Sequence, residues 1–300
     1  MPYLVLGAAQ LAVGAAAIFA RLALGGAGAL AVAAARLGIA AVVLLCMARV
    51  RPKGAKPTKA QAGLLAFAGV ALAAHFAGWI ASLEYTTVAI STLFVATTPI
   101  FTACYDAVVL RRGLSMRSML AFAGGGAGLA MVVAFNHTAP PHAGYEWLGI
   151  ALATGGSIAI AAYFILVREV RDALGTRTIV THTYSWAALA LVASAVLARQ
   201  APPALDAYAA WGGILAMAFV SQLLGHTALN ASLRWFSPSA ISFSTLLEPV
   251  TAAILALIIF HESLSPLSLA GGGLLLVSIA VFLNEERASG WRQPSDWIDP

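Results

Sequence analysis

Long apolar runs separated by short polar segments extend over almost the whole chain. Most runs hold about twenty residues, the length at which a helix crosses a hydrocarbon core ~30 Å thick. They lack the alternation of a barrel strand, and lipid requires each segment to satisfy its own backbone. We therefore predict an all-α membrane protein with ten transmembrane helices. The runs are 3–24, 27–48, 61–83, 86–110, 117–135, 147–167, 177–198, 208–233, 238–260 and 266–283.

The chain repeats itself at half its length. Residues 89–91 (AIS) recur at 240–242 with an offset of 151, and Pro99 recurs as Pro249 with an offset of 150. A repeat of this length indicates an internal duplication, with five helices in each half. Because five is an odd number, the second half must insert upside down relative to the first.

The duplication divides the chain into three parts. We expect a first five-helix repeat at residues 1–135 and a second, inverted repeat at 145–283. Residues 284–300 are polar, and we expect a loose cytoplasmic tail there. The two repeats form one unit, since no linker separates them.

The distribution of Lys and Arg predicts the orientation. With the N-terminus in the cytoplasm, fourteen of the seventeen basic residues fall in cytoplasmic loops or the tail. Outside lie only Arg21 and Arg199, and Arg36 lies within a helix. Cytoplasmic loops of membrane proteins carry an excess of basic residues, so both termini are expected in the cytoplasm.

Composition supports a polytopic membrane protein. Hydrophobic residues make up 61% and charged residues 10% of the chain, against about 25% charged residues in soluble domains. The mean hydropathy is +0.88. The net charge of +5 comes from short loops, so it does not indicate nucleic-acid binding. Cys46 and Cys104 lie in apolar runs without metal-binding spacing and are expected to be small buried hydrophobes.

A set of short motifs in the second half carries a family resemblance. The motifs are Ser237-Pro238, Leu247-Glu248-Pro249, His261-Glu262, Leu264-Ser265-Pro266 and Gly271 to Gly273. With the echo in the first half, the sequence resembles the EamA family of the drug/metabolite transporter superfamily across essentially the whole chain. Within it, the chain looks most like the aromatic amino acid exporter group (YddG-type). The resemblance implies a ten-helix inverted-repeat carrier with a central substrate cavity, working by alternating access.

The first half departs from this pattern at two acidic positions. Thr98 stands where the second half has Glu248, and Arg112 stands where it has Glu262. The resemblance therefore implies no symmetric role for the two acids.

Two duplicated helices carry polar faces within the span. On the third helix the face holds, at i, i+4 and i+7, His75, Trp79 and Ser82. On the eighth helix it holds, at i, i+4 and i+8, Gln222, His226 and Asn230. Such faces cannot look at lipid, so they face the bundle centre. They line a substrate cavity or, alternatively, form hydrogen bonds that hold helices together.

The fourth and ninth helices carry hydroxyls beside a proline. The hydroxyl residues are Ser91, Thr98, Ser244 and Thr245. They line the cavity or bond back to their own helix. Pro99 and Pro249 each remove one backbone hydrogen bond and are expected to kink their helix near the midplane. Tyr163 is either an aromatic anchor at the inner interface or a cavity residue.

Arg36 and Glu248 are the most costly residues in the span. Each lies about ten residues into its run, so at ~1.5 Å per residue both reach the bilayer centre. An unpaired charge there costs ~2.5–3.5 kcal/mol on insertion scales. They could pair directly or through water and hold helices two and nine together. Alternatively, Glu248 takes up a proton in each transport cycle, or it is bonded locally without a role in the cycle.

These observations predict a carrier that exports amino acids, including aromatic and other apolar ones, from the cytoplasm. Hydrogen-bonding groups such as His75, Gln222 and Asn230 would meet the polar backbone of the substrate, while Trp79 and Tyr163 would pack on its side chain. No cluster of intramembrane Lys or Arg is present, which argues against phosphorylated substrates.

The sequence supports other functions less well. A drug or metabolite exporter on the same fold is the main alternative, and a structural assembly partner is disfavoured by the duplicated polar faces. A membrane-embedded enzyme would need a reactive constellation that the sequence lacks, and no metal or cofactor motif is found. We expect the inner membrane of a bacterium-like cell, a small-molecule substrate and the lipid bilayer as partners, and a chain compatible with a monomer.

Overall fold

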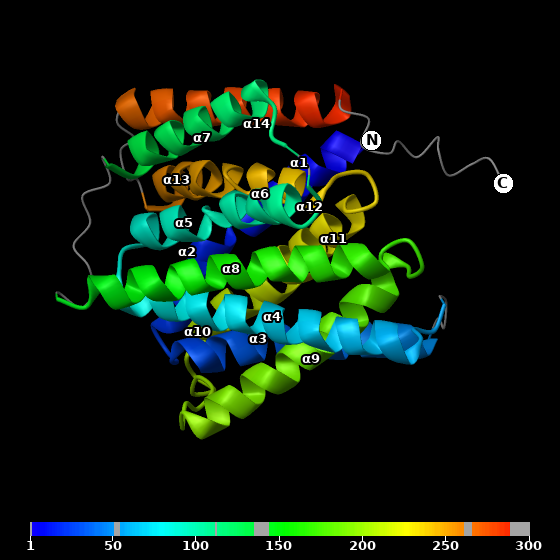
Figure 1. The fold of residues 1–300 in the computed structure, drawn as a ribbon. Helices are drawn as coiled ribbons and strands as arrows, with labels where there is room; N and C mark the ends of the chain where they lie inside the picture. Colours follow the sequence, from blue (N-terminus) through cyan, green and yellow to red (C-terminus); the bar gives the residue numbers. More distant parts are fainter. Residues whose placement is uncertain (1, 51–54, 112, 135–143, 261–265, 289–300) are drawn as a thin grey trace.

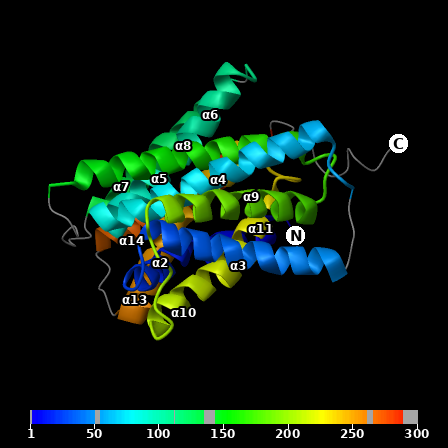
Figure 2. The ribbon, with the colours of Figure 1, turned by 90° about the horizontal axis from the view of Figure 1, so that it is seen from below.

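A bundle of helices fills the computed structural model, which describes residues 2–50, 55–111, 113–134, 144–260 and 266–288. The long helices run roughly along one direction, and the start of α1 and the end of α14 lie at the same end of the bundle (Figures 1 and 2). We call this the termini end. The ends of α3, α6 and α8 and the starts of α4, α7 and α9 also lie there (Figures 1 and 2).

The described elements are all helical and match the ten predicted runs in order. They are α1 Pro2–Gly14, α2 Ala16–Leu24, α3 Ala29–Val50, α4 Lys59–Tyr85, α5 Val88–Val95, α6 Thr98–Val108, α7 Met116–Ala134, α8 Glu146–Val170, α9 Thr176–Leu197, α10 Tyr208–Ala216, η1 Met217–His226, α11 Thr227–Ser232, α12 Pro238–Ser244, α13 Leu247–Phe260 and α14 Pro266–Ala288.

Seven of the ten runs form apolar helical segments long enough to cross a membrane. The predicted class, an all-helical multi-pass membrane protein, is confirmed. The fifth run forms α7, and the fourth and ninth runs are each divided into two shorter helices. The seven segments are 2–24, 29–50, 59–85, 146–170, 176–197, 208–232 and 269–288.

The fourth run is broken, not kinked, just before Pro99. Proline has no N–H, so the carbonyl of Val95 loses the donor that would continue the helix. The Thr98 hydroxyl donates to that carbonyl at 2.7 Å, and the Thr97 hydroxyl donates to Phe94 O at 2.6 Å. The chain turns between α5 and α6, and the second helix starts afresh with Pro99 in its first turn.

The ninth run is broken in the same way before Pro249. The carbonyl of Thr245 accepts from the Glu248 N–H at 2.9 Å instead of from a residue four places on. The hydroxyls of Ser244 and Thr245 donate to Ile241 O and Ser242 O, each at 2.7 Å. Both hydroxyls thus bond back to their own helix, which is one of the two roles expected for them.

The eighth run contains a π-helix, η1, in its middle, where the sequence predicted a regular helix. The wider turn changes the register of its side chains relative to α4, its counterpart in the first half. At Gly225 the wall of α1 is so close that an added Cβ would lie 2.7 Å from Val13 Cγ2. The structure therefore retains the duplicated order of helices but not identical geometry.

The helices pack in pairs that the duplication relates. α4 packs on α8 as α10 packs on α2, while α3 packs on α9 and α7 on α14. Small residues bring the backbones together. A Cβ at Gly78 would lie 2.7 Å from Leu152 O, and one at Gly213 would lie 2.5 Å from Phe19 O. The two contacts occupy related interfaces of the two halves.

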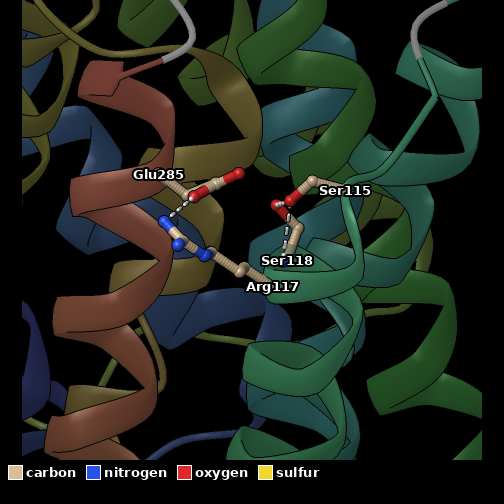
Figure 3. A network of polar contacts seen from close by, with 4 residues as sticks. All are labelled: Ser115, Arg117, Ser118 and Glu285. Atoms are coloured by element: carbon tan, nitrogen blue, oxygen red, sulfur yellow. Dashed lines mark hydrogen bonds and ion pairs between the residues drawn. The ribbon is translucent and has the colours of Figure 1, made fainter.

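The last helix extends beyond its predicted end. The tail was expected to be loose from Asn284, but α14 continues to Ala288. Two acidic side chains of this extension contact neighbouring segments: Glu286 Oε1 accepts from the Ser237 N–H at 2.8 Å, and Arg117 Nη1 on α7 lies 3.6 Å from Glu285 Oε2 (Figure 3). Beside it the Ser115 hydroxyl accepts from the Ser118 N–H at 3.1 Å and starts α7 (Figure 3).

The two cysteines lie on the outside of the helical bundle. Cys46 and Cys104 are exposed, so the prediction of small buried hydrophobes is wrong. Both point outward from the helical bundle, where an apolar run does not distinguish a core position from a lipid-facing one. The His261-Glu262 corner, Arg112 and residues 289–300 lie outside the described residues.

The glycine-rich stretch of α7 makes a close helix contact that can be tested. A Cβ at Gly128 would lie 2.7 Å from the backbone oxygen of Gly271, whereas one at Gly126 would meet nothing within 4 Å. Gly128→Ala should destabilise the protein by about 1–3 kcal/mol, because the backbone of α14 must shift. Gly126→Ala should be neutral or slightly stabilising, because alanine favours helix. Thermal unfolding in detergent measures both, and equal midpoints would contradict the contact.

Candidate substrate cavity

A narrow cavity lies at the centre of the bundle, where helices of both halves meet. The space open to the centres of water molecules is about 30 Å³, room for very few waters. Its lining residues are Val13, Ala16, Arg36, His75, Phe76, Trp79, Val95, Thr98, Ile160, Phe164, His226, Leu229, Thr245 and Glu248. The half-helices α5/α6 and α12/α13 supply Val95, Thr98, Thr245 and Glu248 to this wall.

Arg36 is the largest fully buried side chain among the described residues, with no exposed surface. Its Nε donates to Gln222 Oε1 at 3.0 Å. The guanidinium lies over the Phe76 ring, with Cζ 4.0 Å from the ring centroid. Its Nη2 is buried without a hydrogen-bond partner. The side chain is thus held on two sides and keeps one donor group unused.

Glu248 lines the same cavity from the opposite half. It sits in the first turn of α13, where the positive end of the helix dipole favours a carboxylate. Within the described residues, no ion pair joins it to Arg36 at 4.0 Å or less, although the two charges are close enough to interact. The direct pair considered above is not formed in this conformation. A link through water stays a prediction.

Two histidines and a tryptophan form an aromatic wall. His75 stacks on Trp79 with an interplanar angle of 8°, and its ring lies 6.4 Å from that of His226. His75 Nδ1 lies 3.0 Å from Gly156 O and so donates its proton to that carbonyl. This bond fixes the tautomer and leaves Nε2 as the acceptor. His226 Nδ1 is buried without a partner.

Related hydrogen bonds join the break in the ninth run to α1 and the break in the fourth run to α8. On one side Gln10 Nε2 donates to the Ser244 hydroxyl at 2.6 Å. On the other side the Ser157 hydroxyl lies 3.0 Å from that of Thr98. Gln10 and Ser157 were not predicted as site residues. An isolated polar side chain inside an apolar run was the signal that could have identified each.

Five of the eleven predicted substrate-binding residues line the cavity, namely His75, Trp79, Thr98, His226 and Thr245. The other six form hydrogen bonds to protein groups around it. They are Ser82, Ser91, Tyr163, Gln222, Asn230 and Ser244. The Tyr163 hydroxyl, for example, donates to Asn230 Oδ1 at 2.8 Å, and the Ser82 and Ser91 hydroxyls are 2.6 Å apart. Some of the predicted residues therefore line the cavity, and others form the hydrogen bonds that hold its surroundings together.

The sequence did not indicate the apolar part of the wall. Phe76, Ile160 and Phe164 line the cavity beside the two charged residues. An apolar residue in an apolar run carries no signal of the helix face on which it lies. The result is a cavity with a basic and an acidic side chain on two walls and aromatic surface between them.

Comparison with known proteins identifies the family. The sequence model of the EamA-like transporter family matches residues 1–134 and 147–284. Among the solved structures that match, one crystal structure has a TM-score of 0.76 at 14% identity, covering 96% of this chain and 98% of that chain. At this identity the likeness shows the fold alone. No curated protein matches the sequence. With both halves of the sequence matched by the family and the cavity enclosed between them, the chain belongs to the EamA-like transporter family.

Proposed function

We propose that this transporter exports amino acids, including aromatic and other apolar ones, by alternating access. The observation that carries the proposal is that a guanidinium and a carboxyl side chain line one cavity. Arg36 offers an unused guanidinium donor, and Glu248 has no ion-pair partner among the described residues. A zwitterionic amino acid carries the complementary carboxylate and ammonium groups.

Energetics favour such a ligand over a singly charged one. A buried charge is costly unless a partner of opposite sign accompanies it. A zwitterion supplies both partners at once and adds no net charge to the site. The aromatic surface of Phe76, Trp79 and Phe164 then suits an apolar side chain. This surface also supports the similarity to aromatic amino acid exporters (YddG-type).

The cavity must widen to admit this substrate, since about 30 Å³ accommodates water only. The breaks before Pro99 and Pro249 place two short helices on each side of the site, and a helix break is a suitable hinge. We assign the termini end to the cytoplasm, because the helix ends that flank the predicted basic loops lie at that end (Figures 1 and 2). The inner membrane of a bacterium-like cell fits this orientation.

The charge pair can be tested with analogues that each lack one charge. In proteoliposomes, labelled phenylalanine should be transported, while N-acetylphenylalanine and phenethylamine should not. Arg36→Gln and Glu248→Gln should each lower phenylalanine transport by roughly 10- to 100-fold, the equivalent of one lost charge-assisted hydrogen bond. Arg199→Gln, on a loop at the opposite end from the termini, is the matched control.

Other outcomes of this experiment are informative. If folded Arg36→Gln protein transports phenylalanine normally, the proposed carboxylate contact is wrong. If Glu248→Gln binds substrate but no longer responds to a pH gradient, Glu248 carries a proton instead of meeting the ammonium. Transport of uncharged drugs in preference to all three compounds would favour the drug exporter alternative.

Trp79 should determine preference for bulky side chains. Trp79→Ala should impair transport of phenylalanine and leucine more than that of alanine and glycine, because the aromatic wall is lost while the charged groups stay. Uptake of each labelled amino acid is measured, with a phosphorylated sugar as the negative control. Equal, complete loss for all substrates together with poor expression would instead show that Trp79 is a packing residue.

Cysteine labelling tests the orientation. In a variant without Cys46 and Cys104, cysteines introduced at Arg111 and Arg199 should react with a membrane-impermeant reagent from opposite sides. The cysteine at 199 should be labelled in intact cells, and the one at 111 only after the membrane is opened. Labelling of both from outside would contradict the proposed topology.

A further inference from the structure

A second pocket lies at the termini end, away from the central cavity. It is formed by the connection between α8 and α9 and by the end of the eighth run, and its space open to the centres of water molecules is about 430 Å³. Arg171, Asp172, Gly175, Arg234 and Trp235 line it. None of these residues lines the central cavity, so the pocket is a separate feature.

Arg171 is the residue that makes this pocket unusual. Only 6% of its surface is exposed, and its Nε and Nη1 atoms are buried without a hydrogen-bond partner. Asp172 is the carboxylate nearest in sequence, but its Oδ2 lies 3.9 Å from Arg168 Nη1 and the side chain is largely exposed. Two donor groups of a buried guanidinium therefore remain unused beside an open pocket.

Electrostatics add to this imbalance. Burial and, to a smaller extent, the positive charge of Arg234 lower the pKa of Arg171 to about 10, while Asp172 acts in the opposite direction. The side chain is still charged at neutral pH. Arg234 is exposed, and its Cζ lies 5.4 Å from the centroid of the Trp235 ring. Two like charges thus face one space.

The start of α9 contributes a further positive element. Its N-cap is Gly175, which has no side chain to accept from the first-turn N–H groups, and no side-chain cap is formed. The helix runs for 22 residues, so its N-terminal N–H groups carry the positive end of a full helix dipole. Backbone N–H groups at such an end bind anionic oxygens.

We propose that this pocket binds a phosphate group, held by Arg171 and Arg234 and by the first backbone N–H groups of α9. Arginine forms bidentate hydrogen bonds with phosphate, and the several oxygens of that group can accept from donors on three parts of the chain. The phosphate belongs to an anionic phospholipid headgroup or to a soluble phosphate. Trp235, at the end of a membrane-spanning segment, is placed as an interfacial residue would be.

Thermal unfolding of the full-length protein in detergent tests the site with three probes. They are phosphatidylglycerol, inorganic phosphate and, as a lipid without net charge, phosphatidylcholine. We expect a saturable rise in the unfolding midpoint with phosphatidylglycerol, and native mass spectrometry should show one tightly retained lipid. Arg171→Gln and Arg234→Gln should each raise the half-saturating concentration roughly tenfold or more.

A matched control separates a site from general attraction. Arg49→Gln removes the same charge from the exposed end of α3 and should bind like the unaltered protein. Arg234 is exposed, so its variant provides the test even if Arg171→Gln fails to fold. Stabilisation by phosphatidylglycerol alone supports a headgroup site, and stabilisation by inorganic phosphate as well supports a soluble ligand. No saturable shift with either probe, or equal loss in Arg49→Gln, overturns the proposal.

Discussion

The burial of one guanidinium at the bundle centre is the constraint on which the rest of the structure depends. Arg36 has no exposed surface, and a charge at that depth costs ~2.5–3.5 kcal/mol on insertion scales. The protein offsets part of this with the Gln222 amide and the face of Phe76. Gln222 lies in the π-helix η1, which is the local irregularity that places it there. The offset is incomplete, because Nη2 is buried without a hydrogen-bond partner.

The two helices broken at proline impose a second constraint on the structure. In lipid a freed carbonyl cannot turn to water, so a proline break is tolerated only where other donors replace the lost bond. Before Pro99 the Thr98 hydroxyl donates to the freed carbonyl of Val95, and before Pro249 the Glu248 N–H donates to that of Thr245. Hydroxyls beside both breaks also bond to neighbouring helices, Ser244 to Gln10 on α1 and Thr98 to Ser157 on α8. The duplication therefore repeats a hydrogen bond between each break and a neighbouring helix, even though one copy holds Thr98 and the other Glu248.

The central cavity and the pocket at Arg171 are each lined by a buried arginine with unpartnered donor atoms. In each, a buried arginine retains donor atoms without a partner while a neighbouring group of the chain satisfies only part of the charge. A buried donor atom without a hydrogen-bond partner is costly, so a ligand that accepts from it would stabilise the folded chain. The surroundings differ. Around Arg36 the wall is aromatic and closed, whereas around Arg171 it is open and carries a second arginine.

The sequence by itself determined the class, the order of ten helical runs, the duplication and the costly residues Arg36 and Glu248. These follow from hydropathy, repeat spacing and the price of charge in lipid, which are properties of single segments. It did not determine that Tyr163 bonds Asn230, that Cys46 and Cys104 face outward, or that Phe76 and Phe164 line the cavity. Those depend on how each helix is rotated against its neighbours, and an apolar run looks alike on its lipid and core faces. Only the tertiary structure fixes that rotation, because it arises from close contacts between helices such as those at Gly78 and Gly128.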